Sequence, residues 1–516
     1  MQTQPTQSIR PLNQQSKRWI TGGALVASAL FLFLQTFILP NVPRIANGDQ
    51  GIYLSLAARM MDGQVMYRDF DHFTLPGASV LYLVLFKLLG VRAWIAPAML
   101  IVLGVSIAWL MIRLSENVMT GPIVFLPALL FLTLPFSGYL DATHHWYSVL
   151  AGTAALLVVI EKRTKARVAW SGLLWGIATC FTQSAVIGAM GTGIFLIWEH
   201  YRVTQRGHLL LQKEFSFVGS LVATVLSFNA YFIWKVGLKQ FLNATVVFPV
   251  KYYPADSFNQ WRVYMADPPS IHAYSQWPNV ATFLLVHLAV PLVYILFFVR
   301  YWRESRLHPE EPWDRLFLLS LTGLCLSLSV AHSAGYMRMD TISLPALILL
   351  AWFLKAPFKT ERILLHGLWA MTFVLAVARP VIAQRRWNEF LDLPTGRTAF
   401  SDFPVLYYKC KWVAERTHPG DYFLDDPQIC FALRLRDPSR VPFLRPTDYT
   451  RPEEVRDAVE ALARLHVKFV GWYASLETEI ADSAGDHLAP LRVYLREHYH
   501  VAQRFSNGDE IWERND

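Results

Sequence analysis

The sequence predicts a mainly α-helical membrane protein, with about eleven transmembrane helices, one half-inserted helix and a small C-terminal α/β domain. Three observations support this. Of the 516 residues 53% are hydrophobic and only 17% are charged, long apolar segments recur along the chain, and polar residues become frequent after about residue 385. Average globular chains carry about 25% charged residues, so the depletion indicates burial in lipid.

The net charge of +8 comes largely from basic residues in short loops between apolar segments. Such loops are typical of topology signals that face anionic lipid, so we expect membrane lipids and no nucleic acid as partners.

The first apolar segment, 19–39, is long enough to cross a hydrocarbon core of about 30 Å. It has no small-residue cleavage site, so we expect a retained helix preceded by a cytoplasmic tail, residues 1–18. Ten further segments are expected to cross: 93–112, 122–136, 146–160, 168–182, 184–198, 215–234, 279–299, 316–331, 341–354 and 363–379.

Segment 75–90 is apolar but is not expected to cross. Four loops rich in Lys and Arg, at 161–167, 202–213, 300–306 and 355–362, should all be cytoplasmic. With a cytoplasmic N-terminus they share that side only if 75–90 has both ends on the outer side. We therefore expect a transmembrane domain over 19–379 whose first outer loop is 40–92.

Residues 380–516 should form an extracytoplasmic α/β domain. A turn and strand are expected at 419–426, helices at 451–465 and 485–498, and strands at 467–473 and 510–514, with parallel pairing. No G-x-G-x-x-G is present, so no nucleotide site is expected. In an extracytoplasmic domain Cys410 and Cys430 could form a disulfide.

Asp49 is the leading candidate for chemistry. It opens the stretch NGDQGIYLSLAARMM directly after the first segment. A carboxylate at the membrane surface could accept a proton from an incoming hydroxyl or amine, as a general base does. Because Asp also caps helices, Asp49 could equally begin a helix over 50–62.

Two further outer stretches carry clustered polar groups. In YRDFDHF, the residues Asp69, Asp71 and His72 could bind a metal, position a phosphate or act as an acid–base pair. The alternative is a solvated loop with an Arg–Asp pair. In GYLDATHHW, Asp141 and His145 are spaced i, i+4 and could share a helix face. They could bind substrate, or His145 could anchor the interface; a zinc site would need another ligand.

The stretch AHSAGYMRMD places His332, Tyr336 and Arg338 in a third outer loop. Arginine suits a phosphate because its guanidinium makes bidentate charged hydrogen bonds. The alternative is contact with lipid headgroups.

Together these motifs resemble the GT-C-type integral membrane glycosyltransferases, the group that contains dolichyl-phosphate-mannose protein mannosyltransferases and the bacterial aminoarabinose transferase. The resemblance rests on NGDQGIY after the first segment, MDGQVMYRDFDHFTLPG leading into LFKLLG, YLDATHHW, and HSAGYMR before an LP. It covers about residues 19–160 well and 330–350 more loosely.

The resemblance implies an inverting enzyme of the inner (plasma) membrane. It would transfer a hexosyl or pentosyl group from a polyprenyl-phosphate donor to an extracytoplasmic lipid, glycan or protein. Asp49 would be the base, Asp141 a second acid and Arg338 a phosphate ligand; a divalent metal ion stays open. Two departures are Gln50, where many relatives have Glu, and His72-Phe73-Thr74-Leu75-Pro76, where many have Lys or Glu before Pro-Pro.

The alternative function is a transporter or flippase of lipid-linked glycans. A transporter should carry ionisable groups in the middle of its spans. Here the acids gather at one face, which favours the enzyme.

Overall fold

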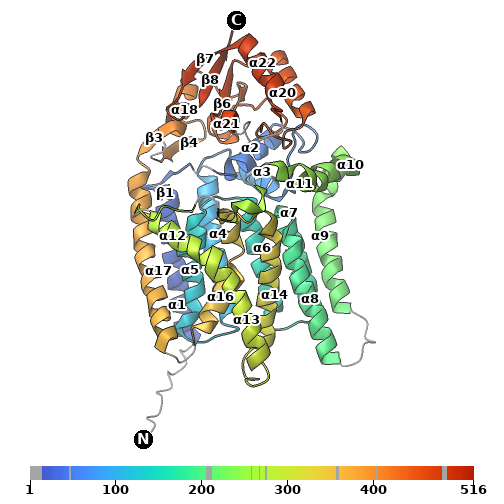
Figure 1. Cartoon of the computed structure of the whole chain (residues 1–516), viewed down its shortest axis with the longest axis vertical. Helices are drawn as coiled ribbons and strands as arrows, with labels where there is room; N and C mark the ends of the chain where they lie inside the picture. Colours follow the sequence, from blue (N-terminus) through green and yellow to red (C-terminus); the bar gives the residue numbers. More distant parts are fainter. Residues whose placement is uncertain are drawn as a thin grey trace.

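The computed structural model describes residues 14–515, except 46–47, 205–211, 257–258, 266–267, 274–275, 356–358, 402–403 and 479–484. Thirteen residues of the expected cytoplasmic tail, 1–13, lie outside the described residues. Figure 1 shows a bundle of long helices with the C-terminal domain seated on one end and the start of α1 at the other.

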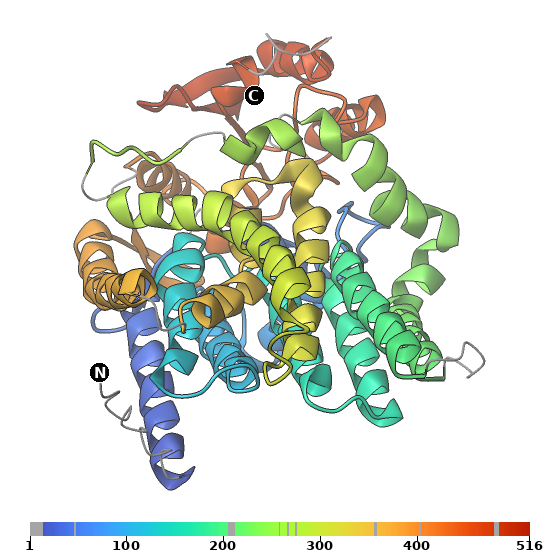
Figure 2. The same ribbon diagram turned by 60° about the horizontal axis from the view of Figure 1, so that its bottom comes forward.

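Each of the eleven apolar segments coincides with helix. The bundle elements are α1 (Gln14–Thr36), α4 (Ile95–Ser115), η1, α5 and η2 (Pro122–Phe136), α6 (His144–Ile160), α7 (Lys165–Phe181), α8 (Ala185–Thr204), α9 (Gln212–Val236), α12, η8 and α13 (Trp277–Glu304), α14 (Trp313–Val330), α16 (Leu344–Phe353) and α17 (Lys359–Arg386). Figure 2 shows α1 beside α17 on one side and α8 beside α9 on the other.

Six of the described helices are long and apolar enough to cross a membrane: Gln15–Thr36, Ile95–Ser115, Gln212–Val236, Trp277–Glu304, Trp313–Ser333 and Lys359–Arg386. Four shorter apolar helices accompany them, at Gly77–Leu89, Pro122–Phe136, His144–Ile160 and Leu344–Phe353. Both the apolar helices and the composition identify an integral membrane protein.

The helix α3 (Gly77–Leu89) corresponds to segment 75–90 and does not run the length of the bundle. At its start, Gly77 lies against the carbonyl of Cys180, in the last turn of α7. Near its end, Phe86 stacks on Phe431 of the C-terminal domain at 5.8 Å. Both ends of α3 therefore lie at the same end of the bundle, where α2 (Gln50–Met61) lies beside it.

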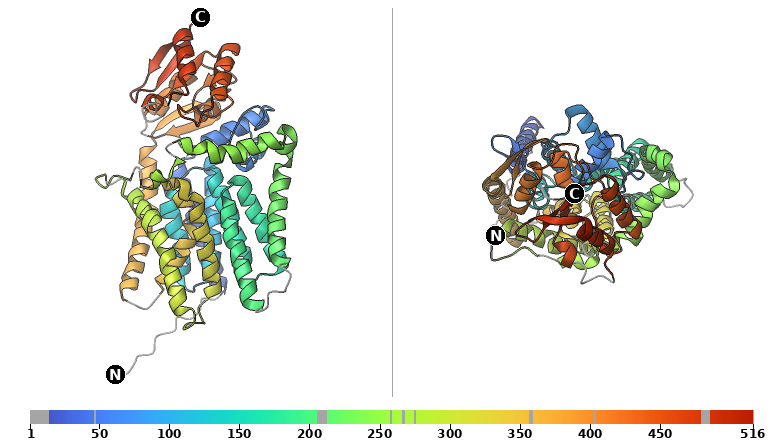
Figure 3. Two further views of the ribbon diagram at one scale, coloured as in Figure 1. Left: turned by 45° about the vertical axis from the view of Figure 1, so that its right-hand side comes forward. Right: turned by 90° about the horizontal axis from the view of Figure 1, so that it is seen from above.

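Ion pairs join the basic loops at the opposite end. Arg163 lies 2.8 Å from Glu199 of α8 and 3.0 Å from Asp314 in the first turn of α14, which ties the loop before α7 to both helices. Lys355 pairs with Glu311 at 2.7 Å. These contacts lie at the end of the bundle away from the C-terminal domain, where α7 and α14 begin (Figure 3).

Between α9 and α12 the chain forms short elements along the upper end of the bundle. These are α10 (Leu238–Leu242), η3 (Asn243–Val247), α11 (Phe248–Lys251), η4 (Tyr253–Ala255) and η6 (Trp261–Met265). After α14 follow η9 (Ala331–Ser333) and α15 (Tyr336–Thr341). These elements and the first outer loop lie under the C-terminal domain (Figure 1).

The C-terminal domain is α/β, as expected. Its four-stranded sheet has the order β5-β6-β8-β7 and is formed by Phe423–Leu424, Phe469–Trp472, Glu510–Arg514 and Tyr499–Arg504. A hairpin of β3 (Glu389–Leu393) and β4 (Gly396–Phe400) joins it to α17. The helices are α18 (Pro404–Ala414), α19 (Pro427–Leu433), α20 (Pro452–Arg464), α21 (Ser475–Thr478) and α22 (Ala489–His498).

The parallel pairing expected for this domain is confirmed for one pair of strands only, and the disulfide that the sequence left open does not form. Only β5 and β6 pair in parallel, because β7 and β8 form a hairpin through Gly508, at φ +87°, and therefore pair antiparallel. Cys410 and Cys430 do not form a disulfide: all four cysteines, which the structure describes, are free and buried. The Cys430 thiol instead donates to the carbonyl of Phe423 at 3.5 Å.

Candidate active site

Asp49 and Asp141 meet at the upper end of the bundle, although 92 positions separate them. The backbone N–H of Gln50 donates to Oδ1 of Asp141 at 3.0 Å, so the start of α2 is held against this carboxylate. Because the first N–H groups of a helix lack intrahelical partners, a carboxylate there is stabilised. Asp141, only 3% exposed, therefore fills the capping role.

Asp49 does stand at the N-cap position of α2, as the capping alternative expected, but its side chain does not act as the cap. Its side chain makes no capping hydrogen bond, and it has no hydrogen-bond partner among the described residues. The residue is exposed at the first position before α2. A free carboxylate at this place is available to a ligand.

Gly48 permits the close approach of the two acids. A Cβ atom at this position would lie 2.2 Å from Oδ2 of Asp141, far inside van der Waals contact. Gln50 closes the arrangement, because its Oε1 accepts the N–H of Ala142 at 3.2 Å. The departure from the resembling family at Gln50 thus has a structural role here.

Arg338 reaches the same region from α15. Its guanidinium donates to the carbonyl of Ser333 at 2.9 Å, to Oδ1 of Asn259 at 3.1 Å and to the hydroxyl of Tyr253. It lies close enough to Asp49 to lower the pKa of that carboxyl. These contacts orient a cation toward the exposed acid.

The surroundings raise the pKa of both acids. Although Asp49 is accessible, neighbouring protein desolvates it and raises its pKa, against the opposing charge of Arg338. The pKa of Asp141 is raised well above its ordinary value by burial and by the charge of Asp49, against the backbone N–H groups facing it. Of the two acids, Asp49 is therefore the one more readily ionised and able to accept a proton.

Aromatic and imidazole side chains surround the acids. The hydroxyl of Tyr53 lies 2.6 Å from Nδ1 of His144, and His144 stacks on His145 with ring centroids 3.9 Å apart. His72 packs edge-on against Tyr53 at 5.4 Å. Burial lowers the pKa of His72 to about 3, so this imidazole is neutral at physiological pH.

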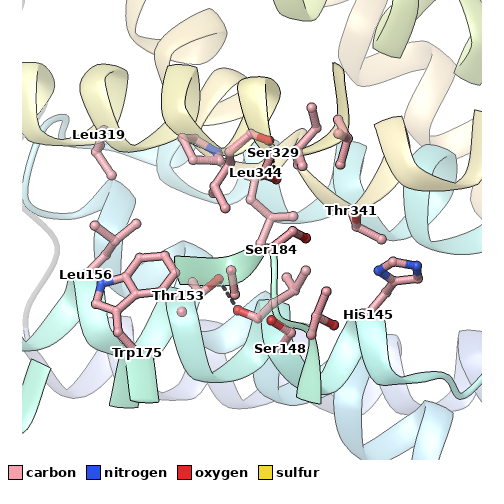
Figure 4. A pocket seen from close by; sticks show the side chains of 18 of the residues that line it. His145, Ser148, Thr153, Leu156, Trp175, Ser184, Leu319, Ser329, Thr341 and Leu344 are labelled. Carbon is pink, nitrogen blue, oxygen red and sulfur yellow. Dashed lines mark hydrogen bonds between the residues drawn. The ribbon is translucent and has the colours of Figure 1, made fainter. Parts of the chain in front are cut away.

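His145 also lines a narrow cavity of about 60 Å³ within the bundle. Figure 4 shows His145 and Thr341 at one end of it and Leu156, Trp175 and Leu319 at the other. This volume holds a few water molecules, so it is too small for a sugar. His145 therefore lies between its neighbour His144 and a small, mostly apolar cavity.

The structure places other predicted residues apart from the two acids. Asp69 pairs with Arg68 at 2.8 Å and accepts the N–H of Val65 at 2.7 Å, as in the solvated-loop alternative. Asp71 lies 3.4 Å from Arg440 of the C-terminal domain. His332 is exposed on η9, where desolvation by neighbouring protein and then the charge of Arg338 lower its pKa.

Tyr336 faces away from Arg338, because residues two apart on a helix point to opposite sides. A Cβ on Gly138 would lie 2.9 Å from its hydroxyl and 3.2 Å from Oδ2 of Asp340. Asp340 is fully buried, and Arg379, from α17, donates nearby to the carbonyl of Ser137 at 3.2 Å. Tyr336 thus belongs to a polar cluster with Asp340 and Arg379, and not to the group of side chains around Asp49.

Asp141 and His145 do not share a helix face, since α6 begins only at His144. Sequence reasoning missed the contribution of Tyr53, Tyr253 and Asn259. Loop 236–278 is rich in aromatic residues, which does not single out Tyr253, and no local pattern marks Asn259.

A divalent ion fits the two acids only in part. Oδ2 of Asp141 is buried without a hydrogen-bond partner, and the Asp49 carboxylate is free among the described residues. No group of three or more His, Cys, Asp or Glu side chains within the described part of the chain could hold a metal. Water would have to complete the shell, as Mg²⁺ sites allow.

Comparison with solved structures identifies the fold. The archaeal oligosaccharyltransferase AglB from Archaeoglobus fulgidus, in complex with an inhibitory peptide and a dolichol-phosphate, matches 98% of this chain and 75% of its own at 11% identity, with a TM-score of 0.54. The same enzyme tethered to an acceptor peptide containing the NVT sequon matches over the same shares and at the same identity, with a TM-score of 0.53. The chain therefore has the GT-C-type fold that its motifs resemble. No protein-family model and no curated protein matches the sequence.

Proposed function

From the GT-C-type fold shared with that oligosaccharyltransferase, we propose that the protein is an inverting glycosyltransferase of the inner (plasma) membrane. It transfers a hexosyl or pentosyl group from a polyprenyl-phosphate donor to an acceptor outside the cytoplasm, which is a lipid, a glycan or a protein. The observation that carries this proposal is the exposed, unpartnered carboxylate of Asp49 between buried Asp141 and cationic Arg338.

In the proposed reaction Asp49 takes a proton from an acceptor hydroxyl or amine. The freed lone pair attacks the anomeric carbon, and the bond between that carbon and the phosphate oxygen breaks on the opposite face. The electron pair leaves with the polyprenyl phosphate, whose charge Arg338 stabilises. Asp141 keeps α2 in place through Gln50. Where Asp49 and Asp141 hold a divalent ion, it would neutralise phosphate charge.

An apolar groove supports a lipid donor. It has a volume of about 800 Å³, runs between α13 and α14, and includes Met339, next to Arg338. Tyr264 and the exposed Arg262 also line it. Exposed Ile295 and Val299 lie along it, which suits an isoprenoid chain entering from the bilayer. The fold comparisons do not support the transporter alternative.

The decisive experiment is Asp49→Asn in isolated membranes, following release of polyprenyl phosphate from a lipid-phosphate sugar. We expect turnover to fall about 10²- to 10⁴-fold, as for loss of a general base. The matched control is Asp62→Asn, an exposed acid at the other end of α2 that should keep full turnover. Normal turnover in Asp49→Asn would show that Asp49 is not the general base.

For topology we propose a cytoplasmic N-terminus and an extracytoplasmic C-terminal domain. The basic loops at the end away from that domain support this orientation. The four native thiols are buried, so single cysteines at Lys162 and Glu415 can be labelled selectively. An impermeant maleimide added to intact cells should label only position 415; labelling of position 162 alone would reverse the orientation.

A further inference from the structure

A cavity of about 490 Å³ lies between the first outer loop, the corner between α9 and α10, and the C-terminal domain. We call it the His72 cavity; it is lined by residues within 71–73, 236–248 and 440–457. Its volume falls in the range of ~300–1,000 Å³ typical of small-molecule sites. The reaction proposed above uses no residue of this lining.

His72 is the feature of this cavity that calls for a ligand. The residue is only 5% exposed, and neither ring nitrogen has a hydrogen-bond partner within the described part of the chain. Leaving a buried polar group unpaired costs about 1–3 kcal/mol, so such groups are normally satisfied. A neutral imidazole offers one donor and one acceptor, which suits hydroxyl groups.

Aromatic rings form one wall of the His72 cavity. Phe248 lies edge-on to Tyr449 at 5.2 Å, Tyr449 stacks with Phe443 at 5.4 Å, and Phe73 stacks with Phe248 at 5.9 Å. Amphipathic ligands commonly place an apolar face on such rings while a few polar groups fix their orientation.

Charged side chains of both signs complete the lining, and their positive and negative charges nearly cancel. Asp71 lies 3.4 Å from Arg440, and Glu454 pairs with Arg451. The acids are Asp71, Glu453, Glu454 and Asp457, and the bases are Lys239, Arg440 and Arg451. This mixture of donors and acceptors fits a neutral ligand with many hydroxyls better than a strongly charged one.

Two tyrosines, Tyr53 and Tyr253, connect the lining of the His72 cavity to the candidate active site. Phe73 contacts Tyr253 with ring centroids 4.6 Å apart, and Tyr253 accepts a hydrogen bond from Arg338. His72 packs against Tyr53, whose N–H donates to the carbonyl of Asp49 at 3.3 Å. These side chains separate the His72 cavity from Asp49 and Arg338, so the cavity neighbours the candidate active site.

We propose that the His72 cavity binds a neutral glycan, the acceptor whose terminal hydroxyl receives the sugar. This inference rests on the proposed function and names its acceptor class. A peptide acceptor is less favoured, because the described lining of the cavity offers no open strand edge to which an extended peptide could add through main-chain hydrogen bonds. The lining residues lie on helices and loops of the described chain, with none from a strand.

The test is ligand-observed saturation-transfer NMR with the full-length protein in nanodiscs. The probes are maltotriose, chitotriose and the capped tripeptide Asn-Ala-Thr, each without donor. We expect saturation transfer to at least one trisaccharide. Its affinity should fall about 5- to 10-fold in His72→Phe, as for loss of one or two hydrogen bonds, and in Tyr449→Ala. His366→Phe and Tyr201→Ala, exposed residues on the bundle helices α17 and α8, are the matched controls.

The proposal is overturned if the protein binds the tripeptide but no trisaccharide, or binds neither. It is also overturned if the two cavity variants bind a trisaccharide as well as the two control variants do. If Tyr449→Ala lowers the melting temperature, His72→Phe alone decides. The test also separates this inference from the proposed function, since Asp49→Asn should bind the trisaccharide normally while losing turnover. If the wild-type protein binds the trisaccharide but transfers no sugar to it, only the proposed transferase activity is contradicted.

Discussion

The backbone N–H of Gln50 donates to Oδ1 of Asp141 at 3.0 Å, while the side chain of Gln50 accepts the N–H of the next residue, Ala142. Two hydrogen bonds thus tie the start of α2 to the loop before α6. The consequence is that Asp49 is exposed beside a buried carboxylate, and its position depends on the close approach at Gly48.

We predict that Gly48→Ala abolishes most turnover. The added methyl group would lie 2.2 Å from Oδ2 of Asp141, so the loop must move and Asp49 with it. Displacements of about 1 Å in a reacting group can cost ~10²-fold in rate. Lipid-phosphate release measures the effect. The control is Gly219→Ala, where no atom lies within 4 Å of the new Cβ; equal turnover in the two variants would contradict the role of the close approach.

We predict that Arg338→Gln moves the acidic limb of the pH–activity profile to higher pH. Desolvation raises the pKa of Asp49, and Arg338 opposes this by lowering it. Without the guanidinium the pKa rises further, so a higher pH is needed to keep the base deprotonated. The pH dependence of kcat/KM measures the shift, because it reports the free enzyme. Arg306→Gln, in an exposed basic loop, is the control; a shift of Arg338→Gln to lower pH would contradict the pairing.

We predict that Asp437→Asn raises the melting temperature at pH 8 and has little effect at pH 4. Burial raises the pKa of Asp437 to about 7, although Arg59 at 3.8 Å opposes it. An acid with a raised pKa binds more protons folded than unfolded, so its ionisation lowers stability as pH rises from about 4 to 7. Asparagine removes that term and can still accept the N–H of Ser439. Thermal unfolding of the purified protein at both pH values checks this; destabilisation at pH 8 would show that the contact with Arg59 outweighs burial.

Much of the bundle could be predicted from the sequence, because apolar runs of bilayer length are a local signal. The position of α3 could also be predicted. The loops rich in Lys and Arg lie on one side of the membrane only if segment 75–90 does not cross it. Strand β8 matched its expected bounds of 510–514. By contrast β7 (Tyr499–Arg504) carries polar residues on an exposed face and lacks the alternation that marks a strand.

Less of the candidate site was predictable. Asp49, Asp141 and Arg338 were proposed from residue type and position. The distant partners of Asp141 and Arg338 come from 79 to 91 residues away and leave no local pattern. The direction of Tyr336 depended on where a helix begins: α15 starts at Tyr336, which sends Tyr336 and Arg338 to opposite sides. Similarly, the start of α6 at His144 removed the expected pairing of Asp141 with His145.

The C-terminal domain rests directly on the helix that carries the candidate base. A Cβ on Gly51, in the first turn of α2, would lie 2.8 Å from Cβ of Gln428. The N–H of Asp71 donates to the carbonyl of Arg440 at 2.7 Å. Cleavage of the chain between α17 and β3 would consequently not release an independent accessory module. Loss of the C-terminal domain would remove the contacts that hold α2 and the first outer loop in place. The helix bundle alone should therefore have no transferase activity, even while it stays inserted in lipid.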